Sequence, residues 1–118
     1  MQTIIRAPGF SLTDAIENHV HTRLGFAFSR SSSRVRRIHI TLSDLNGPRG
    51  GIDKRCLIDV HLDGLAAVVV EDVQSDMYTA IDRAAGRAAR TVMRRLALNS
   101  SRRRHQAQQH AQRLSMEQ

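Results

Sequence analysis

The sequence predicts an α+β fold in the order β-α-β-β-β-α, in which one four-stranded, mainly antiparallel sheet carries two helices packed on one face. Three observations predict it. The 118 residues suit a single domain, and 41% of them are apolar and available for a core. Four short segments have the composition of strands, and two longer segments repeat apolar residues at helical spacing. The strands alternate apolar and polar residues, so one sheet face is expected in the core and the other in water.

The first strand and the first helix are expected near the N-terminus. Residues 2–6 are a short β-run that a Pro-Gly pair ends. The helix is expected to begin at Ser11, which with Asp14 resembles a capping box, and to fade near Phe28, before a linker at residues 29–34. Its apolar residues recur at every fourth position: Leu12, Ile16, Val20 and Leu24.

Three more strands are predicted in the middle of the chain. The first covers residues 35–42, the second begins at Cys56, and the third covers residues 66–73. Residues 46–51 form a turn by composition, and Asp63-Gly64 is a hairpin turn signal. On the first two of these strands, the side chains expected to face the core are Ile38, Ile40, Leu42, Cys56, Ile58, Val60 and Leu62.

A long second helix is predicted from its cap, Ser75 or Asp76, to Asn99, where an Asn-Ser-Ser sequence is expected to end it. One face collects Tyr78, Ile81, Ala85, Ala88, Val92 and Leu96. Almost opposite lie four arginines at steps of four, three and four: Arg83, Arg87, Arg90 and Arg94. At about 1.5 Å per residue, this stripe is about 16 Å long. Gly86 lies within it, where we favour a tolerated imperfection over a place for close approach of a phosphate.

The charge is concentrated at one end of the chain. The formal net charge is +7, yet residues 1–82 hold nine Lys/Arg against ten Asp/Glu, and residues 83–118 hold nine Arg against Glu117 alone. Seventeen of the eighteen cations are arginine, whose planar fork suits phosphate oxygens. A merely solvated helix face normally interleaves Glu with its cations, so the missing anions favour nucleic acid as the partner.

The candidate RNA-binding residues extend beyond the stripe. Residues 99–118 form a basic tail without an apolar stripe, which we expect to be mobile beside a folded domain of residues 1–98. Five arginines at the end of the first helix and the entry to the second strand would widen the patch if the fold brings them to the stripe. The full set is Arg83, Arg87, Arg90, Arg94, Arg95, Arg23, Arg30, Arg34, Arg36, Arg37, Arg102, Arg103 and Arg104.

The sequence offers no catalytic constellation. His39, His61 and Asp59 share the outward side of neighbouring strands and are a candidate metal site, although polar residues on the wet face of a sheet are the commoner explanation. Cys56 has the parity of a core residue and no second cysteine to pair with. No nucleotide-binding or hydrolase motif is present, so no cofactor or small-molecule substrate is expected. Neither a secretory signal nor an apolar run of about 20 residues is present, so a cytoplasmic protein without a membrane partner is expected.

The junction VEDVQSDMYTAIDRA and the strand pair RIHITLSDL and CLIDVHLDG resemble the ribosome hibernation promoting factor family, whose members are also called ribosome-associated translation inhibitors or sigma-54 modulation proteins. The resemblance covers about residues 1–98. It implies that the junction residues start the helix and enter the core: Asp76, Met77, Tyr78, Ala80, Ile81 and Asp82.

This resemblance also implies a function. Such factors are not enzymes; they bind small-subunit ribosomal RNA in the channel for mRNA and tRNA, block the tRNA sites, and hold ribosomes inactive under stress. The four stripe arginines fall where the family faces ribosomal RNA. The sequence departs from the family's pattern in three ways. Its second helix carries only arginine as its basic residue, where lysine and some acidic residues are common in the family. Its tail is basic rather than acidic, and the C-terminal dimerisation domain of long members is absent. These departures imply an unusual short form that is monomeric off the ribosome.

We therefore expect a ribosome-associated translation inhibitor that contacts phosphates more than bases. Three alternatives stay open. The first is a general RNA- or DNA-binding protein without ribosome specificity. The second is a basic module that docks an acidic protein, and the third is a small metal-dependent enzyme using His39, His61 and Asp59.

Overall fold

The computed structural model describes residues 1–46 and 51–116. Its elements confirm the predicted order, whereas most of the turn expected over residues 46–51 lies outside the described residues. The elements are β1 (Gln2–Arg6), α1 (Asp14–Ala27), β2 (Val35–Asp44), β3 (Lys54–Leu62), β4 (Val68–Gln74) and α2 (Met77–Met116).

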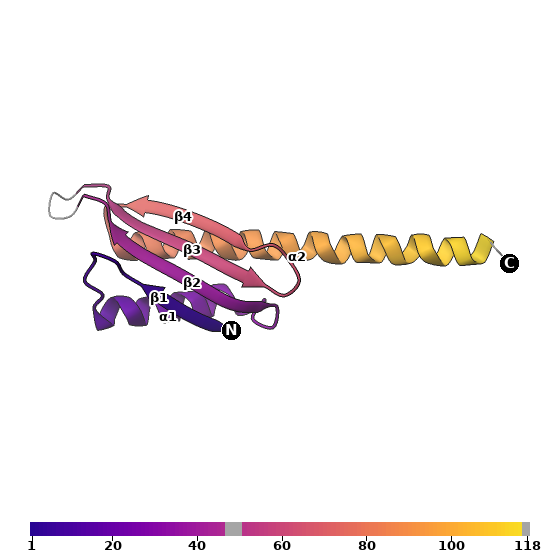
Figure 1. Ribbon diagram of the computed structural model, residues 1–118, viewed down its shortest axis with the longest axis horizontal. Helices are drawn as coiled ribbons and strands as arrows, with labels where there is room; N and C mark the ends of the chain where they lie inside the picture. Colours follow the sequence, from indigo (N-terminus) through magenta and orange to yellow (C-terminus); the bar gives the residue numbers. More distant parts are fainter. Residues whose placement is uncertain (47–50, 117–118) are drawn as a thin grey trace.

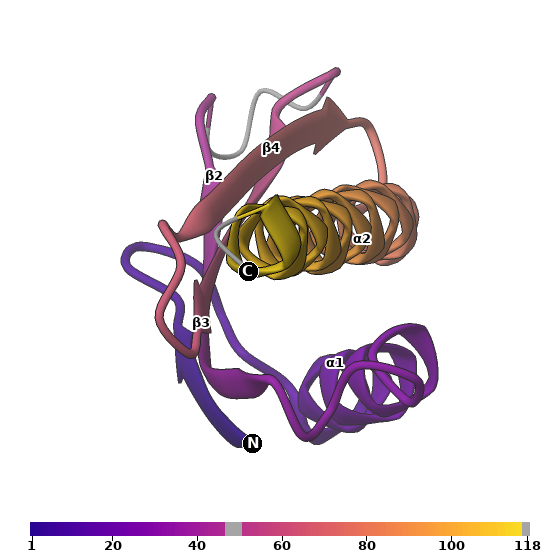
Figure 2. The same ribbon diagram turned by 90° about the vertical axis from the view of Figure 1, so that its right-hand side faces the viewer.

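The strands form one mixed sheet in the order β1-β2-β3-β4. β1 pairs with β2 in parallel, and the other two pairs are antiparallel. Figure 1 shows α1 and α2 running alongside each other, and Figure 2 shows both on the same face of the sheet. The predicted fold class is therefore confirmed, and the second sheet face is left open.

The core lies between the sheet and the helices. Every residue predicted to face inward from β2 and β3 is buried, because alternation places them all on the helix side. Ala84, Ala85 and Ala88 of α2 are fully buried, and their short side chains let the helix lie close to the strands. Leu12 and Tyr78, predicted to lie in the core, are each 37% exposed at its margin.

Side-chain caps start both helices. Asp76 caps α2 as predicted, because its Oδ2 accepts a hydrogen bond from the Thr79 backbone N–H at 3.0 Å. The expected cap of α1 at Ser11 is wrong. Thr13 is the N-cap, and its Oγ1 accepts from the Ile16 backbone N–H at 3.2 Å. Two residues that offer the same hydroxyl cannot be ranked from local sequence alone.

The end predicted for α2 at Asn99 is also wrong, since the helix continues to Met116. No glycine or proline follows Asn99, and arginine, glutamine and alanine, which favour helices, dominate the next fifteen residues. The helix therefore extends well beyond the sheet, and the molecule measures 73 × 22 × 19 Å (Figure 1). We call residues 100–116 the arm.

Cys56 provides a test of this core. It is fully buried on β3, and burial raises the pKa of its thiol to about 12, with the neighbouring Asp72 carboxylate adding to the shift. Only the thiolate is nucleophilic, so iodoacetamide at pH 8 should alkylate the folded protein at least about 100-fold more slowly than the urea-unfolded chain. Mass spectrometry over time measures both rates. Similar rates would show that Cys56 is accessible.

Candidate nucleic-acid interface

The arginine stripe of α2 faces water. The four arginines Arg83, Arg87, Arg90 and Arg94 are all exposed. The buried residues between them are Ala84, Ala85, Ala88 and Val92. This orientation follows from the helical period: residues packed on the sheet force those about half a turn away to point outward. The predicted separation of an apolar and a cationic face is confirmed.

The expectation that carboxylates are missing around the stripe is wrong for two of the four arginines. Asp72, on β4, lies 3.6 Å from Nε of Arg83 and 3.3 Å from Nη1 of Arg87. Arg87 also donates to the backbone carbonyl of Glu71 at 2.8 Å. The anion comes from the neighbouring strand, which helical spacing within α2 does not reveal. Both arginines remain exposed, and each guanidinium has five donors, so donors are left for a partner.

Asp72 is a residue of this candidate surface that sequence reasoning missed. Its carboxylate is almost entirely buried beneath the arginines, and it also accepts a hydrogen bond from Gln74 at 2.6 Å. A signal was present, because Asp72 continues the inward-facing series of Val68 and Val70 on β4. A carboxylate at such a position needs a partner. The partner is the stripe itself, so Asp72 fixes two of its side chains against the sheet.

Arg90 and Arg94 are less restrained. Arg94 has one weak contact, 3.5 Å from the Thr91 hydroxyl. Within residues 1–46 and 51–116, no hydrogen bond or ion pair involves Arg90. Its Nη1 instead lies 3.4 Å from where a Cβ of Gly86 would be. This distance is an ordinary van der Waals contact with the end of a flexible side chain, so the position does not require glycine and Gly86 gains no role beyond the tolerated imperfection that we favoured.

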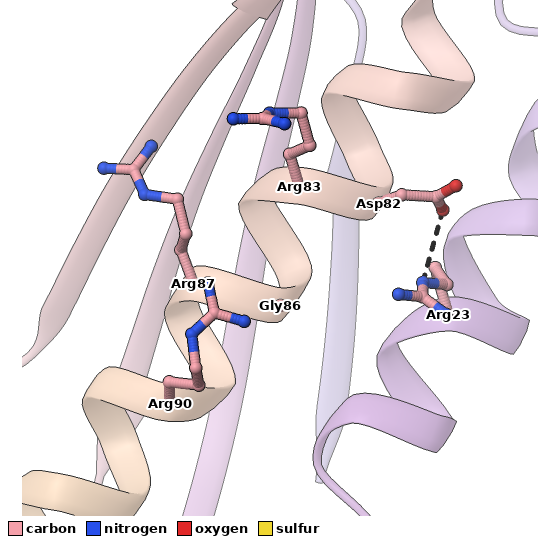
Figure 3. Close-up of a pocket in the computed structure, with 6 residues that line it drawn as sticks. All are labelled: Arg23, Asp82, Arg83, Gly86, Arg87 and Arg90. Carbon is pink, nitrogen blue, oxygen red and sulfur yellow. Dashed lines mark ion pairs between the residues drawn. The ribbon is translucent and has the colours of Figure 1, made fainter.

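A groove between α1 and α2 collects much of this charge. It has a volume of about 290 Å³, and Figure 3 shows Arg23 of α1 directed toward Asp82, whereas Arg83 and Arg87 extend from α2 on the side away from α1. Its lining residues are Arg23, Asp82, Arg83, Gly86, Arg87 and Arg90. Four guanidinium groups line the groove, and the two nearby carboxylates, Asp82 and Asp72, leave an excess of positive charge, so an anionic backbone could lie here.

The carboxylate in the groove, Asp82, joins the two helices. Its Oδ1 lies 2.7 Å from His19 Nε2 and 3.2 Å from Arg23 Nε. The His19 ring also packs edge-on against Tyr78, with centroids 5.0 Å apart. These contacts hold Arg23 near the stripe, and they explain why Tyr78 lies at the core margin rather than within it.

The arginines after α1 do not form one patch with the stripe. Arg30 and Arg34 lie in the connection to β2, at the end of the sheet where α2 leaves it (Figure 1). Arg36 pairs with Asp63 at 3.4 Å, and Arg37 faces away from the helices because its neighbour Ile38 faces them. Of the five arginines outside the second helix, Arg23 is the one that joins the stripe in the groove.

The remaining candidate RNA-binding arginines differ in whether they contact the rest of the domain. Arg95 is tied to the loop before β4, since its Nη1 donates to the carbonyls of Ala66 and Ala67 at 2.8 and 3.1 Å. Arg102, Arg103 and Arg104 lie on the arm and are exposed. Arg95 thus has a structural contact, whereas the arm arginines project beyond the domain.

The side chains on the open sheet face do not support the candidate metal site of His39, His61 and Asp59. His39 and His61 have ring centroids 5.3 Å apart, and His61 Nε2 lies 3.4 Å from Asp59 Oδ2. Among the described residues, however, no group of three or more His, Cys, Asp or Glu side chains is placed to hold a metal ion. In the same part of the chain, no helix is both long and apolar enough to cross a membrane.

Comparison with known proteins now defines the family. Residues 3–97 match the model of the sigma 54 modulation protein / S30EA ribosomal protein family. The chain belongs to this family. It is a family of ribosome-associated, non-enzymatic modulators of translation, as the resemblance implied. No curated protein matches the chain.

Solved structures resemble this member of the S30EA family. The N-terminal domain of Protein Y from Thermus thermophilus is 32% identical, with a TM-score of 0.60 over 79% of this chain and 93% of that one. A ribosomal subunit interface protein from Coxiella burnetii shares the fold, with 17% identity and a TM-score of 0.69 over 82% and 99% of the two chains. The family match ends at residue 97, so it does not include the arm.

Proposed function

We propose that this S30EA family protein binds small-subunit ribosomal RNA in the channel for mRNA and tRNA, and keeps ribosomes inactive by covering the tRNA sites. It acts in the cytoplasm as a monomer, without a cofactor, and residues 1–98 form the ribosome-binding domain. The observation that supports the proposal is the exposed cationic surface of α2, three of whose arginines line one groove together with Arg23 of α1.

The chemistry of this surface favours phosphates over bases. Arginine binds phosphate oxygens through two parallel hydrogen bonds, and Arg90 has no competing partner among the described residues. Aromatic side chains for base stacking are scarce, since only one Tyr and three Phe occur in the chain. Affinity should therefore come largely from counterion release and fall steeply with salt.

Sedimentation of purified protein with small ribosomal subunits tests the proposal. We expect comigration with the subunit at 50 mM salt and its loss at high salt, because six to ten phosphate contacts cost about 10³- to 10⁵-fold in affinity between 50 and 200 mM. Initiator tRNA bound beforehand to the P site should reduce the binding. Undiminished binding beside tRNA would contradict a position in the tRNA sites.

Competition with bulk RNA separates this proposal from its nearest rival. A ribosome inhibitor should stay on the subunit in the presence of an equal mass of unstructured RNA. A general RNA-binding protein should distribute itself between the two in proportion to their phosphates. Complete transfer to bulk RNA would leave RNA binding in place and remove the ribosomal preference.

A further inference from the structure

The arm is a helix with no support from the domain. Residues 100–114 are all exposed, and among the described residues the one side-chain hydrogen bond of the arm is internal, between Gln109 and His105 at 3.0 Å. Most helical stability in proteins comes from tertiary packing of an apolar face, which this segment lacks. The three consecutive arginines at its start also repel one another. The arm therefore gains stability from any partner that neutralises it.

The arginines of the arm extend over about 200° of the helix circumference instead of lying on one narrow side. Successive residues point about 100° apart, so Arg102, Arg103 and Arg104 face three directions. Arg113 follows eleven residues after Arg102, which returns it to within about 20° of the same direction. No carboxylate occurs in the sequence from Arg83 to Met116. A partner on one side of the arm would leave some of these cations unmatched.

This distribution narrows the class of partner. Ala107, Ala111 and Leu114 make a short apolar strip, which is too small to seat the helix in a membrane surface or a coiled coil. An acidic protein surface presents its anions from one side. A double-helical RNA presents phosphates from two strands on either side of its wide, shallow minor groove, and arginine-rich segments become ordered on binding RNA.

We propose that the arm is a second RNA-binding element, which lies in a groove of double-helical RNA and receives phosphates from both strands. This inference rests on the proposed ribosome binding and adds a contact outside the family-matched residues 3–97. The stripe and the arm belong to one continuous helix. Binding of the domain therefore sets the direction in which the arm meets neighbouring RNA.

Three single variants of the full chain, Arg102→Gln, Arg103→Gln and Arg104→Gln, test whether the arm is enclosed. Glutamine preserves helix propensity, and circular dichroism checks that it does. The salt dependence of binding is measured with purified small subunits and with a 20-base-pair RNA duplex. Each variant should lower the slope by about 0.9, because each direction meets a phosphate. A slope unchanged in one or two variants would show a one-sided contact and overturn the proposal.

Two comparisons separate this inference from the function on which it rests. Arg90→Gln should lower the slope for the small subunit; if it does and all three arm variants do not, the arm inference alone fails. If Arg90→Gln also leaves the slope unchanged, both the arm inference and the proposed function fail. The duplex should compete with the subunit for the arm better than polyglutamate of equal charge. Equal competition would assign the arm to an acidic protein.

Discussion

Replacing Arg83, Arg87, Arg90 and Arg94 together by glutamine is expected to remove about half of the salt-dependent affinity for the small ribosomal subunit. Four lost phosphate contacts at about 0.9 each should lower the slope of log K against log salt by about 3.6. Over a fourfold change in salt, this difference is on the order of 10²-fold in affinity. Fluorescence anisotropy of labelled protein at several salt concentrations measures the slope.

The four arginines differ in their contacts within the described part of the chain, because only Arg83 and Arg87 pair with Asp72. A double variant, Arg90→Gln with Arg94→Gln, keeps the pairs of Arg83 and Arg87 with Asp72 and should lower the slope by about 1.8, half of the loss expected for the quadruple variant. The double variant Arg87→Ala with Arg90→Ala should also lose up to about 1.8, at a larger cost in stability because Arg87 contacts Asp72 and Glu71.

A control with the same net charge distinguishes the stripe from overall electrostatics. Arg6, Arg36, Arg37 and Arg55 lie outside the groove, and their replacement by glutamine also removes four positive charges. This variant should retain most of the slope. An equal loss in the two quadruple variants would show that the α2 stripe has no special place in the interface.

Replacing Phe28 by alanine is expected to have the largest effect on stability. Phe28 is fully buried just after α1, among the largest buried side chains of the described core. Deleting a buried aromatic ring costs about 3–5 kcal/mol, from the lost transfer free energy and the remaining cavity. For a domain whose whole stability is about 5–15 kcal/mol, such a loss is a large fraction. Urea unfolding followed by circular dichroism measures it.

Phe26, two residues earlier, is the matched control. Its side chain is 76% exposed, and its ring lies 6.0 Å from the Arg23 guanidinium carbon. Phe26→Ala deletes the same ring but leaves no core cavity, so it should cost less than about 1 kcal/mol, the value of an exposed cation–π contact. Equal destabilisation by the two variants would contradict the orientation of the end of α1.

Patterns within one element determined much of this protein from its sequence. Alternation identified the buried faces of β2 and β3, and the helical period placed the four α2 arginines on the exposed side of the helix. Asp76 was a recognisable cap because its side chain acts on a backbone group three residues away. Such features depend on neighbours along the chain, so the order of residues is sufficient to find them.

Contacts between elements were decided only by the tertiary structure. Asp72 reaches Arg83 and Arg87 because β4 lies beside α2, and Arg23 enters the groove because the two helices lie alongside each other. Arg37 lies on the other side because sheet packing decides which face of β2 meets the helices. The physical reason is that charge pairing depends on distance in space, whereas the periods of helices and strands are properties of the chain itself.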